Sequence, residues 1–171
     1  MDLRSFFDRA IRASFRDLAV HDEPVATYLG DVLTRFARTE TLYPPGLALP
    51  RLETVVDMLL DIQTAWQEDA AHFSPGHELT VRRHIGDYTM FMIGCFRERV
   101  ERIASTGYYI SQGKRAYHFV SEHARARRGA GSPPYGRLAE HFERYASVLD
   151  YTRRVHFHDA PGLPFFRLAL D

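Results

Sequence analysis

Apolar residues recur along most of this chain with the 3.6-residue spacing of amphipathic helices. The first such stretch runs from Asp2 to about Val20, with arginine and aspartate on its opposite face. A second begins at Asp22, a suitable N-cap residue, with Pro24 in the first turn. The predicted buried stripes are Leu3, Phe6, Phe7, Ala10, Ile11, Ser14, Phe15 and Leu18 in the first helix, and Val25, Tyr28, Leu29, Val32 and Phe36 in the second.

Four more helical stretches follow, separated by Pro- and Gly-containing breaks. The third helix carries Leu52 to Ala70, the fourth runs from about Glu78 to Ile103, the fifth from about Tyr108 to Arg128, and the sixth, with Ser132 as a candidate cap, carries Leu138, Phe142, Tyr145 and Leu149. The middle of the fourth is apolar nearly all round, as expected of a buried helix. The pattern predicts an all-α fold, a compact bundle of five to six antiparallel helices around a buried central helix. We expect one domain over residues 1–171, with 157–171 as an irregular tail docked on the bundle.

Composition narrows the class of protein. The 22 basic and 22 acidic residues cancel, so nucleic-acid binding is not expected. The longest apolar stretch, Ile85 to Phe96, is interrupted by Asp87 and falls short of the ~20 residues that span a bilayer. Cys95 is the only cysteine, which rules out an intrachain disulfide. These features predict a cytoplasmic protein with no membrane segment.

Polar residues on the fourth and fifth helices are the main candidates for a ligand-binding site. At about 100° per residue, His84 lies within the apolar stripe of the fourth helix and Asp87 lies at its edge. A buried carboxylate and imidazole need partners, because an unpaired buried charge is costly. Tyr109 and Tyr117 face inward on the fifth helix and are placed to supply them. Together with Tyr88, these residues form either a small-molecule pocket or a purely structural network.

The same two helices carry two motifs. Residues 86–96 read G-D-Y-T-M-F-M-I-G-C-F, and residues 108–117 read Y-Y-I-S-Q-G-K-R-A-Y. A G-D-aromatic-x-x-F-x-x-G segment followed by Y-Y-x-x-x-G-x-x-x-Y resembles a family of uncharacterised bacterial all-helical proteins. The resemblance covers the central third of the chain, and the family carries no assigned activity. It draws attention to Asp87, Tyr109, Gly113 and Tyr117 without implying a chemistry or a cofactor.

Nine histidines make metal binding a second hypothesis. A di-iron bundle needs inward-facing Glu-x-x-His pairs, and the chain contains none. His84 and His123, with Asp87 as a third residue, instead resemble the ligand set of DinB-like helical bundles. This hypothesis implies a metal-dependent enzyme.

A nuclease of the HEPN type is a more remote hypothesis. It requires an arginine followed a few residues later by a histidine on a helix, and Arg153 and His158 fit that spacing. However, Asp159 to Gly162 already ends the helix at that point. We therefore expect first a non-catalytic helical module that binds a small molecule or another protein. The sequence alone does not identify the ligand, the oligomeric state or a catalytic activity.

Overall fold

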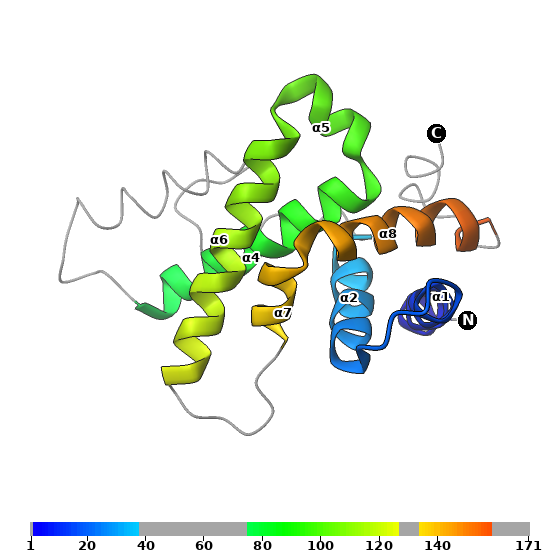
Figure 1. Cartoon of the computed structure of the whole chain (residues 1–171), viewed down its shortest axis with the longest axis horizontal. Coiled ribbons are helices and arrows are strands. Elements are labelled where there is room, and N and C mark those ends of the chain that lie inside the picture. Colours follow the sequence, from blue (N-terminus) through cyan, green and yellow to red (C-terminus); the bar gives the residue numbers. More distant parts are fainter. Residues whose placement is uncertain (1, 38–74, 127–133, 159–171) are drawn as a thin grey trace.

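The computed structural model describes residues 2–37, 75–126 and 134–158, and every regular element within them is a helix (Figure 1). The helices are α1 (Leu3–Asp17), α2 (Glu23–Phe36), α4 (Pro75–Cys95), α5 (Arg97–Ile103), α6 (Thr106–Ala126), α7 (Tyr135–Glu140) and α8 (Phe142–His156). The predicted all-α fold class is confirmed. The third predicted helix, the candidate cap Ser132 and the tail beyond His158 lie outside the described residues.

Helix α2 begins as its sequence predicts. The Asp22 side chain accepts a hydrogen bond from the backbone N–H of Val25 at 3.2 Å, and Pro24 lies in the first turn. A capping carboxylate satisfies a backbone donor that has no partner within the helix. The same carboxylate accepts hydrogen bonds from Arg137 at 2.7 Å and from the Tyr145 hydroxyl at 3.1 Å. Asp22 therefore ties the start of α2 to α7 and α8.

Helix α1 ends in a tight turn with left-handed backbone. Ala19 has a φ of 53°, and the N–H of Val20 donates to the carbonyl of Phe15 at 2.8 Å. This pattern is a Schellman motif, in which the residue after the C-cap takes the left-handed conformation. Leu18 was predicted to belong to the buried stripe of this helix, and that prediction is wrong: the helix ends at Asp17 and leaves Leu18 41% exposed.

Two of the predicted helices are each divided in the structure. The stretch expected from Glu78 to Ile103 forms α4 and α5, because the backbone leaves helical angles at Phe96 (φ −137°, ψ 37°). The ring of Phe96 packs against Phe91, with 5.5 Å between their centroids. A second break, at His141 (φ −112°, ψ 32°), separates α7 from α8. Periodicity does not reveal these breaks, because the buried positions continue in phase across them.

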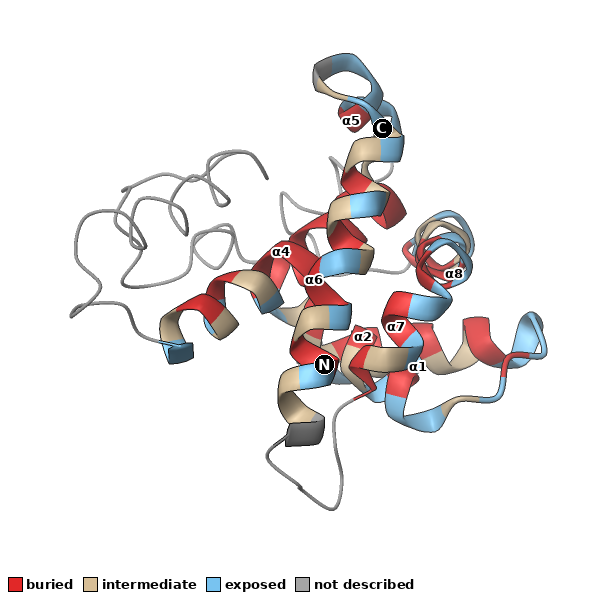
Figure 2. Ribbon diagram, turned by 60° about the vertical axis from the view of Figure 1, so that its left-hand side comes forward, coloured by how far each residue is buried: buried red, intermediate tan, exposed pale blue. Residues whose placement is uncertain are grey.

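Helices α4 and α6 pack tightly against each other at the centre of the molecule (Figure 1). The middle of α4 is buried nearly all round (Figure 2), as predicted for the central helix. A Cβ atom at Gly113 would lie 2.4 Å from the Thr89 hydroxyl and 2.5 Å from the Phe142 ring. At Gly94 it would lie 2.6 Å from Leu149. Glycine at these positions allows α6 and α8 to approach α4 closely.

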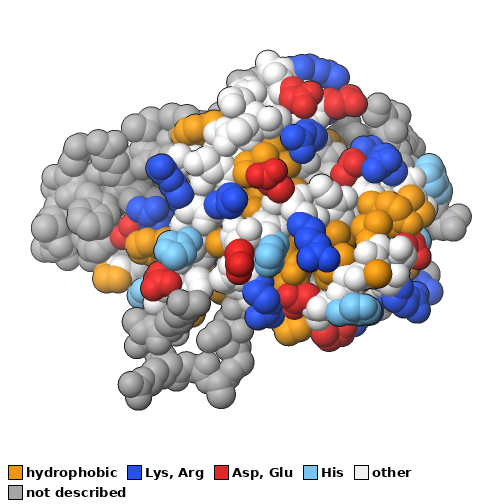
Figure 3. Space-filling view, viewed as in Figure 1, with side chains coloured by type: hydrophobic (Ala, Val, Ile, Leu, Met, Phe, Trp, Pro, Cys, Tyr) orange, Lys and Arg blue, Asp and Glu red, His pale blue; other side chains and the backbone are white. Residues whose placement is uncertain are grey.

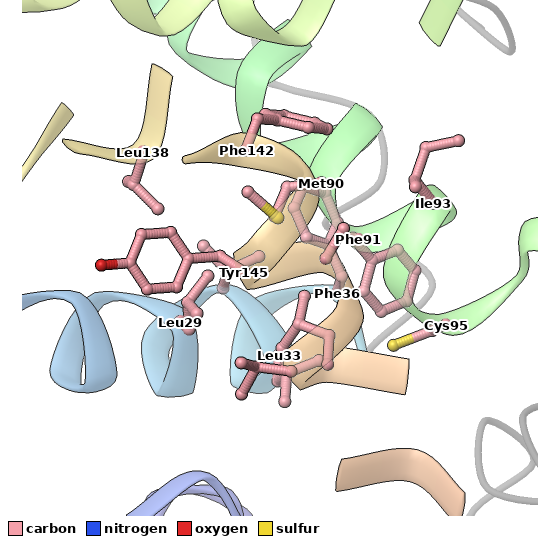
Figure 4. Close-up of a cluster of buried hydrophobic side chains, with 14 of the residues drawn as sticks. Leu29, Leu33, Phe36, Met90, Phe91, Ile93, Cys95, Leu138, Phe142 and Tyr145 are labelled. Carbon is pink, nitrogen blue, oxygen red and sulfur yellow. The ribbon is translucent and has the colours of Figure 1, made fainter. Parts of the chain in front are cut away.

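Figure 4 shows the part of the hydrophobic core that lies where α2, α4, α7 and α8 meet, and α1 and α6 add further buried side chains to the same core. The labelled side chains come from these four helices: Leu29, Leu33 and Phe36 from α2, Met90, Phe91, Ile93 and Cys95 from α4, Leu138 from α7, and Phe142 and Tyr145 from α8. The stripe predicted for the sixth helix is therefore confirmed as buried, although two helices share it. Burial of this apolar area is the main force that holds the helices together.

Candidate functional site

A fully buried carboxylate, that of Asp87 in the middle of α4, joins three helices. Its Oδ1 accepts hydrogen bonds from the hydroxyls of Tyr28 on α2, at 2.7 Å, and Tyr117 on α6, at 2.8 Å. Its Oδ2 accepts from the guanidinium of Arg35 on α2 at 2.7 Å. Both carboxylate oxygens are thus satisfied by protein donors, as a buried charge requires. We call these four residues the Asp87 cluster.

The electrostatics of the cluster keep each donor protonated. Burial, followed by the negative charge of Asp87, raises the pKa of Tyr28 and of Tyr117 well above the ordinary value of 10.0. Burial alone would lower the pKa of Arg35, but the charge of Asp87 and its hydrogen bond outweigh burial and raise that pKa. These groups are therefore fixed hydrogen-bond donors at neutral pH, and the tyrosines are poor candidates for general bases.

Aromatic rings and a close backbone contact enclose the cluster. The ring of Tyr135 packs against Tyr28 at 5.3 Å and against Tyr117 at 6.0 Å between centroids. A Cβ atom at Gly86 would lie 2.7 Å from the Tyr117 ring. Space that a ligand would need beside Asp87 is therefore filled by side chains of the protein itself.

The other predicted pocket residues form a separate row of ring contacts. His84 stacks on Tyr88 with 6.2 Å between centroids, and Tyr88 lies 6.2 Å from Tyr109. His84 also contacts Phe36 at 5.4 Å. Burial raises the pKa of Tyr109, and the Tyr88 side chain partly offsets that rise. Of the five predicted residues, Asp87 and Tyr117 are thus directly bonded, and the remaining three pack as rings.

The residues proposed as metal ligands do not form a coordination group. Within the described parts of the chain, no three His, Cys, Asp or Glu side chains are arranged to hold an ion. The carboxylate of Asp87 is already occupied by the three donors of its cluster, and the Nε2 atom of His123 is buried without a hydrogen-bond partner. His84, Asp87 and His123 are therefore not brought together as a DinB-like site would need.

The arginine and histidine of the proposed nuclease motif have structural partners. Arg153 forms an ion pair with Asp150 at 2.7 Å. His158 lies beyond the end of α8, and its Nε2 atom is 2.7 Å from the backbone carbonyl of Arg154. Both side chains bond to their own helix, so this geometry provides no converging catalytic pair.

A large surface groove lies between α1 and the start of α2, far along the chain from the predicted site residues. Its volume is about 1190 Å³. The buried residues that line it, Phe6, Ala10, Phe15, Val20 and Ala26, form its floor, and the more exposed Arg9, Arg12, Arg16, His21 and Glu23 form its rim. None of the residues that sequence reasoning selected for a site lines this α1–α2 groove.

Sequence reasoning missed Tyr28 and Arg35 as partners of Asp87, and it missed the groove. Tyr28 was expected on the buried stripe of α2, but its bond to Asp87 joins residues 59 positions apart. The groove depends on how α1 and α2 are turned relative to each other at Ala19. The sequence feature that could have indicated the groove is the alternation of arginine with small apolar residues along α1. The same alternation is equally typical of an ordinary solvent-exposed helix face.

Comparison with known proteins gives no relative: no family model, curated protein or solved structure matches this chain. The resemblance of residues 86–96 and 108–117 to a bacterial helical family therefore stays a prediction. In the described part of the chain, each helix is too short or too polar to span a membrane.

Proposed function

We propose that this protein is a non-catalytic interaction module that holds an acidic amphipathic helix of a partner protein in the α1–α2 groove. The observation that supports the proposal is the groove itself, with a buried apolar floor and an arginine-rich rim. By contrast, the Asp87 cluster is filled and hydrogen-bonded throughout, which favours a structural role for it.

The size of the groove favours a peptide segment over a small molecule. Small-molecule pockets typically enclose roughly 300–1,000 Å³ and bury most of the ligand. The α1–α2 groove, at about 1190 Å³, lies at the surface and is larger than that range. An amphipathic helix places apolar side chains three and four residues apart on such a floor and leaves its polar face to the rim. Ala10, Ala13 and Ala26 leave room for those side chains.

Charge on the rim favours an acidic partner. Three arginines and two acidic residues line the groove. Both acids have cationic partners, because Glu23 bonds to Arg12 and Asp22 bonds to Arg137 at 2.7 Å. The side chain of Arg16 forms no hydrogen bond or ion pair with another described residue, so its charge is available to a partner. Complementary charge of this kind speeds association and selects against basic peptides.

A pair of synthetic peptides tests the proposal. Both would be helical, about 18 residues long, with the same Leu-rich apolar face and either glutamate or lysine on the polar face. We expect saturable binding of the glutamate peptide by fluorescence anisotropy and at least about tenfold weaker binding of the lysine peptide. Failure of the glutamate peptide to bind, or equal affinity for both peptides, would contradict the proposal.

Variants locate the binding to the groove. Arg16→Glu reverses a rim charge, and Ala13→Trp fills the space above the floor. Each should weaken binding of the glutamate peptide by about tenfold or more. Arg83→Glu on α4 is the matched control, because Arg83 is exposed and does not line the groove. An equal loss in the Arg83 variant would show that binding is general electrostatic attraction instead. Circular dichroism confirms that each variant is folded.

A further inference from the structure

A second cavity, between α6 and α7, has a different chemical character from the α1–α2 groove. Its volume is about 680 Å³, and polar side chains dominate its lining. Lys114, His118 and Ser121 line it from α6, and Arg137 and Glu140 line it from α7. Figure 3 shows the face that carries α6 and α7, on which basic and histidine side chains lie among acidic ones. We call this space the α6–α7 cavity.

Helix geometry directs three donors from α6 into the cavity together. Lys114, His118 and Ser121 are spaced by four and three residues, which places them on one face of a helix. Arg115 also lines the cavity. The side chains of Lys114 and Arg115 form no ion pair or hydrogen bond with another described residue. Two cations without acidic partners in the described structure thus stand at one cavity.

The hydroxyl of Ser121 is available as a donor at the cavity. The residue is 9% exposed and lines the cavity, and its side chain has no hydrogen-bond partner among the described residues. Its oxygen is not one of the fully enclosed unpartnered polar atoms of the described residues, so it is open to the cavity. Mid-helix serines often donate to the carbonyl four residues earlier, as Ser14 does to Ala10 at 2.9 Å, and Ser121 does not. Its donor is therefore left for an occupant of the cavity.

The guanidinium of Arg137 is held in place on the opposite wall. Asp22 accepts from its Nε at 2.7 Å and from its Nη2 at 3.2 Å. The Nη1 atom of Arg137 takes no part in these two bonds to Asp22. A fixed guanidinium loses less conformational freedom when it binds an anion than a free one does.

We propose that the α6–α7 cavity binds the phosphate group of a small polyhydroxylated metabolite. Lys114, Ser121 and Arg137 supply ammonium, hydroxyl and guanidinium donors, a set that suits the several oxygens of a phosphate monoester. Glu140 also lines the cavity and provides an acceptor for ligand hydroxyls. No phenylalanine, tyrosine or tryptophan is among the described residues of the lining, so a large ring on which a nucleobase could stack is not among them. The volume matches a metabolite.

The first test uses inorganic phosphate as the probe. Titration of the ¹⁵N-labelled full chain, at an ionic strength held constant with sodium chloride, should shift the amide signals of residues 114–122 and 135–140 saturably. Glycerol 3-phosphate should then bind more tightly than inorganic phosphate, because it adds hydroxyls that can donate to Glu140. Shifts that never saturate, or that fall elsewhere in the chain, would overturn the site. Equal affinity for the two probes would overturn the assignment to a polyhydroxylated ligand.

Three variants test the assignment of the donors. Lys114→Gln should weaken phosphate binding about tenfold or more, and Ser121→Ala about three- to fivefold, as expected for a charged and a neutral donor. Arg83→Gln removes an equal charge from an exposed position outside the cavity and should change affinity less than twofold. Equal weakening in the Arg83 variant, or none in the Lys114 variant, would contradict the proposal. Because Ser121→Ala is a small change, it serves even if the Lys114 variant folds poorly.

Discussion

The ring of Tyr117 lies directly against the backbone of Gly86, so close that a Cβ atom there would come within 2.7 Å of the ring. The ring is fully buried, and its hydroxyl donates to Asp87 at 2.8 Å. It therefore has little freedom to move aside. The glycine and the aspartate that follow each other in the first motif thus serve one contact between α4 and α6.

Gly86→Ala should therefore destabilise the protein although alanine is the better helix former. We expect a loss of about 1–3 kcal/mol in the free energy of unfolding, measured by urea denaturation. Gly107→Ala in α6 is the matched control, because the nearest side-chain atom to its Cβ lies at an ordinary 3.5 Å. That variant should be neutral or more stable by up to about 1 kcal/mol. Equal effects of the two substitutions would show that the contact with the Tyr117 ring does not cause the loss of stability.

The Asp87 cluster should contribute far more to the free energy of unfolding than a surface ion pair does. Asp87→Asn leaves Arg35 without its counter-charge and presents an amide to donors that need an acceptor. We expect a loss of about 3 kcal/mol in the free energy of unfolding. The same change at Asp31, whose ion pair with Arg4 is solvent-exposed, should cost less than about 0.5 kcal/mol. A cost below about 1 kcal/mol for Asp87→Asn would argue that the cluster does not hold the helices together.

These contacts show which features the sequence could predict. Asp87 lies in the middle of a helix that is apolar nearly all round, and Tyr117 lies on the apolar face of the next long helix, so their burial followed from the sequence. Arg35 lies 52 positions from Asp87, and its pairing depends on which faces of α2 and α4 meet. Periodicity assigns a face to each helix but does not say which helices pair. The sequence therefore identified Asp87 and Tyr117, but not their cluster partners Tyr28 and Arg35.

The same limit explains the cavities and the breaks. Each cavity is lined by side chains from separate helices, so its existence depends on their packing. At Phe96 and His141, a single residue with non-helical backbone angles divides a helix without changing its apolar stripe. Asp22, by contrast, was identified as a cap because capping is a local interaction within four residues. The cap at Asp22 could therefore be predicted from the local sequence, whereas the cavities, which depend on tertiary contacts, could not.

The left-handed turn at Ala19 predicts a stabilising substitution. A side chain disfavours a φ of 53°, and glycine does not. Ala19→Gly should raise the free energy of unfolding by about 0.5–1 kcal/mol. Ala13→Gly in the middle of α1 should instead lower it by about 1 kcal/mol. Thermal and urea denaturation of both variants should show changes in stability of opposite sign. A loss of stability in the Ala19→Gly variant would contradict the assigned turn.

Acid titration should reveal the contribution of Asp22. Burial opposes ionisation of this carboxyl, but hydrogen bonds from Arg137, the Val25 amide and Tyr145 outweigh burial and lower its pKa below 3.8. The stabilisation is therefore complete above pH 3.8 and is lost as the pH falls through the lower, folded-state pKa. Asp22→Asn keeps a capping side chain and should cost about 1 kcal/mol at pH 7. The difference from the unmodified protein should shrink below that pH, and a difference independent of pH would exclude the ionic contribution.

Cys95 should report global unfolding rather than act as a reactive thiol. The side chain is 4% exposed, and burial raises its pKa to about 12, so almost no thiolate forms at neutral pH. Labelling by Ellman's reagent should be slow in native buffer and should accelerate with urea in parallel with unfolding followed by circular dichroism. Because the chain has no other cysteine, every labelled molecule reports this position. Rapid labelling that does not depend on urea would show that the packing of α4 and α8 around Cys95 opens locally in the native state.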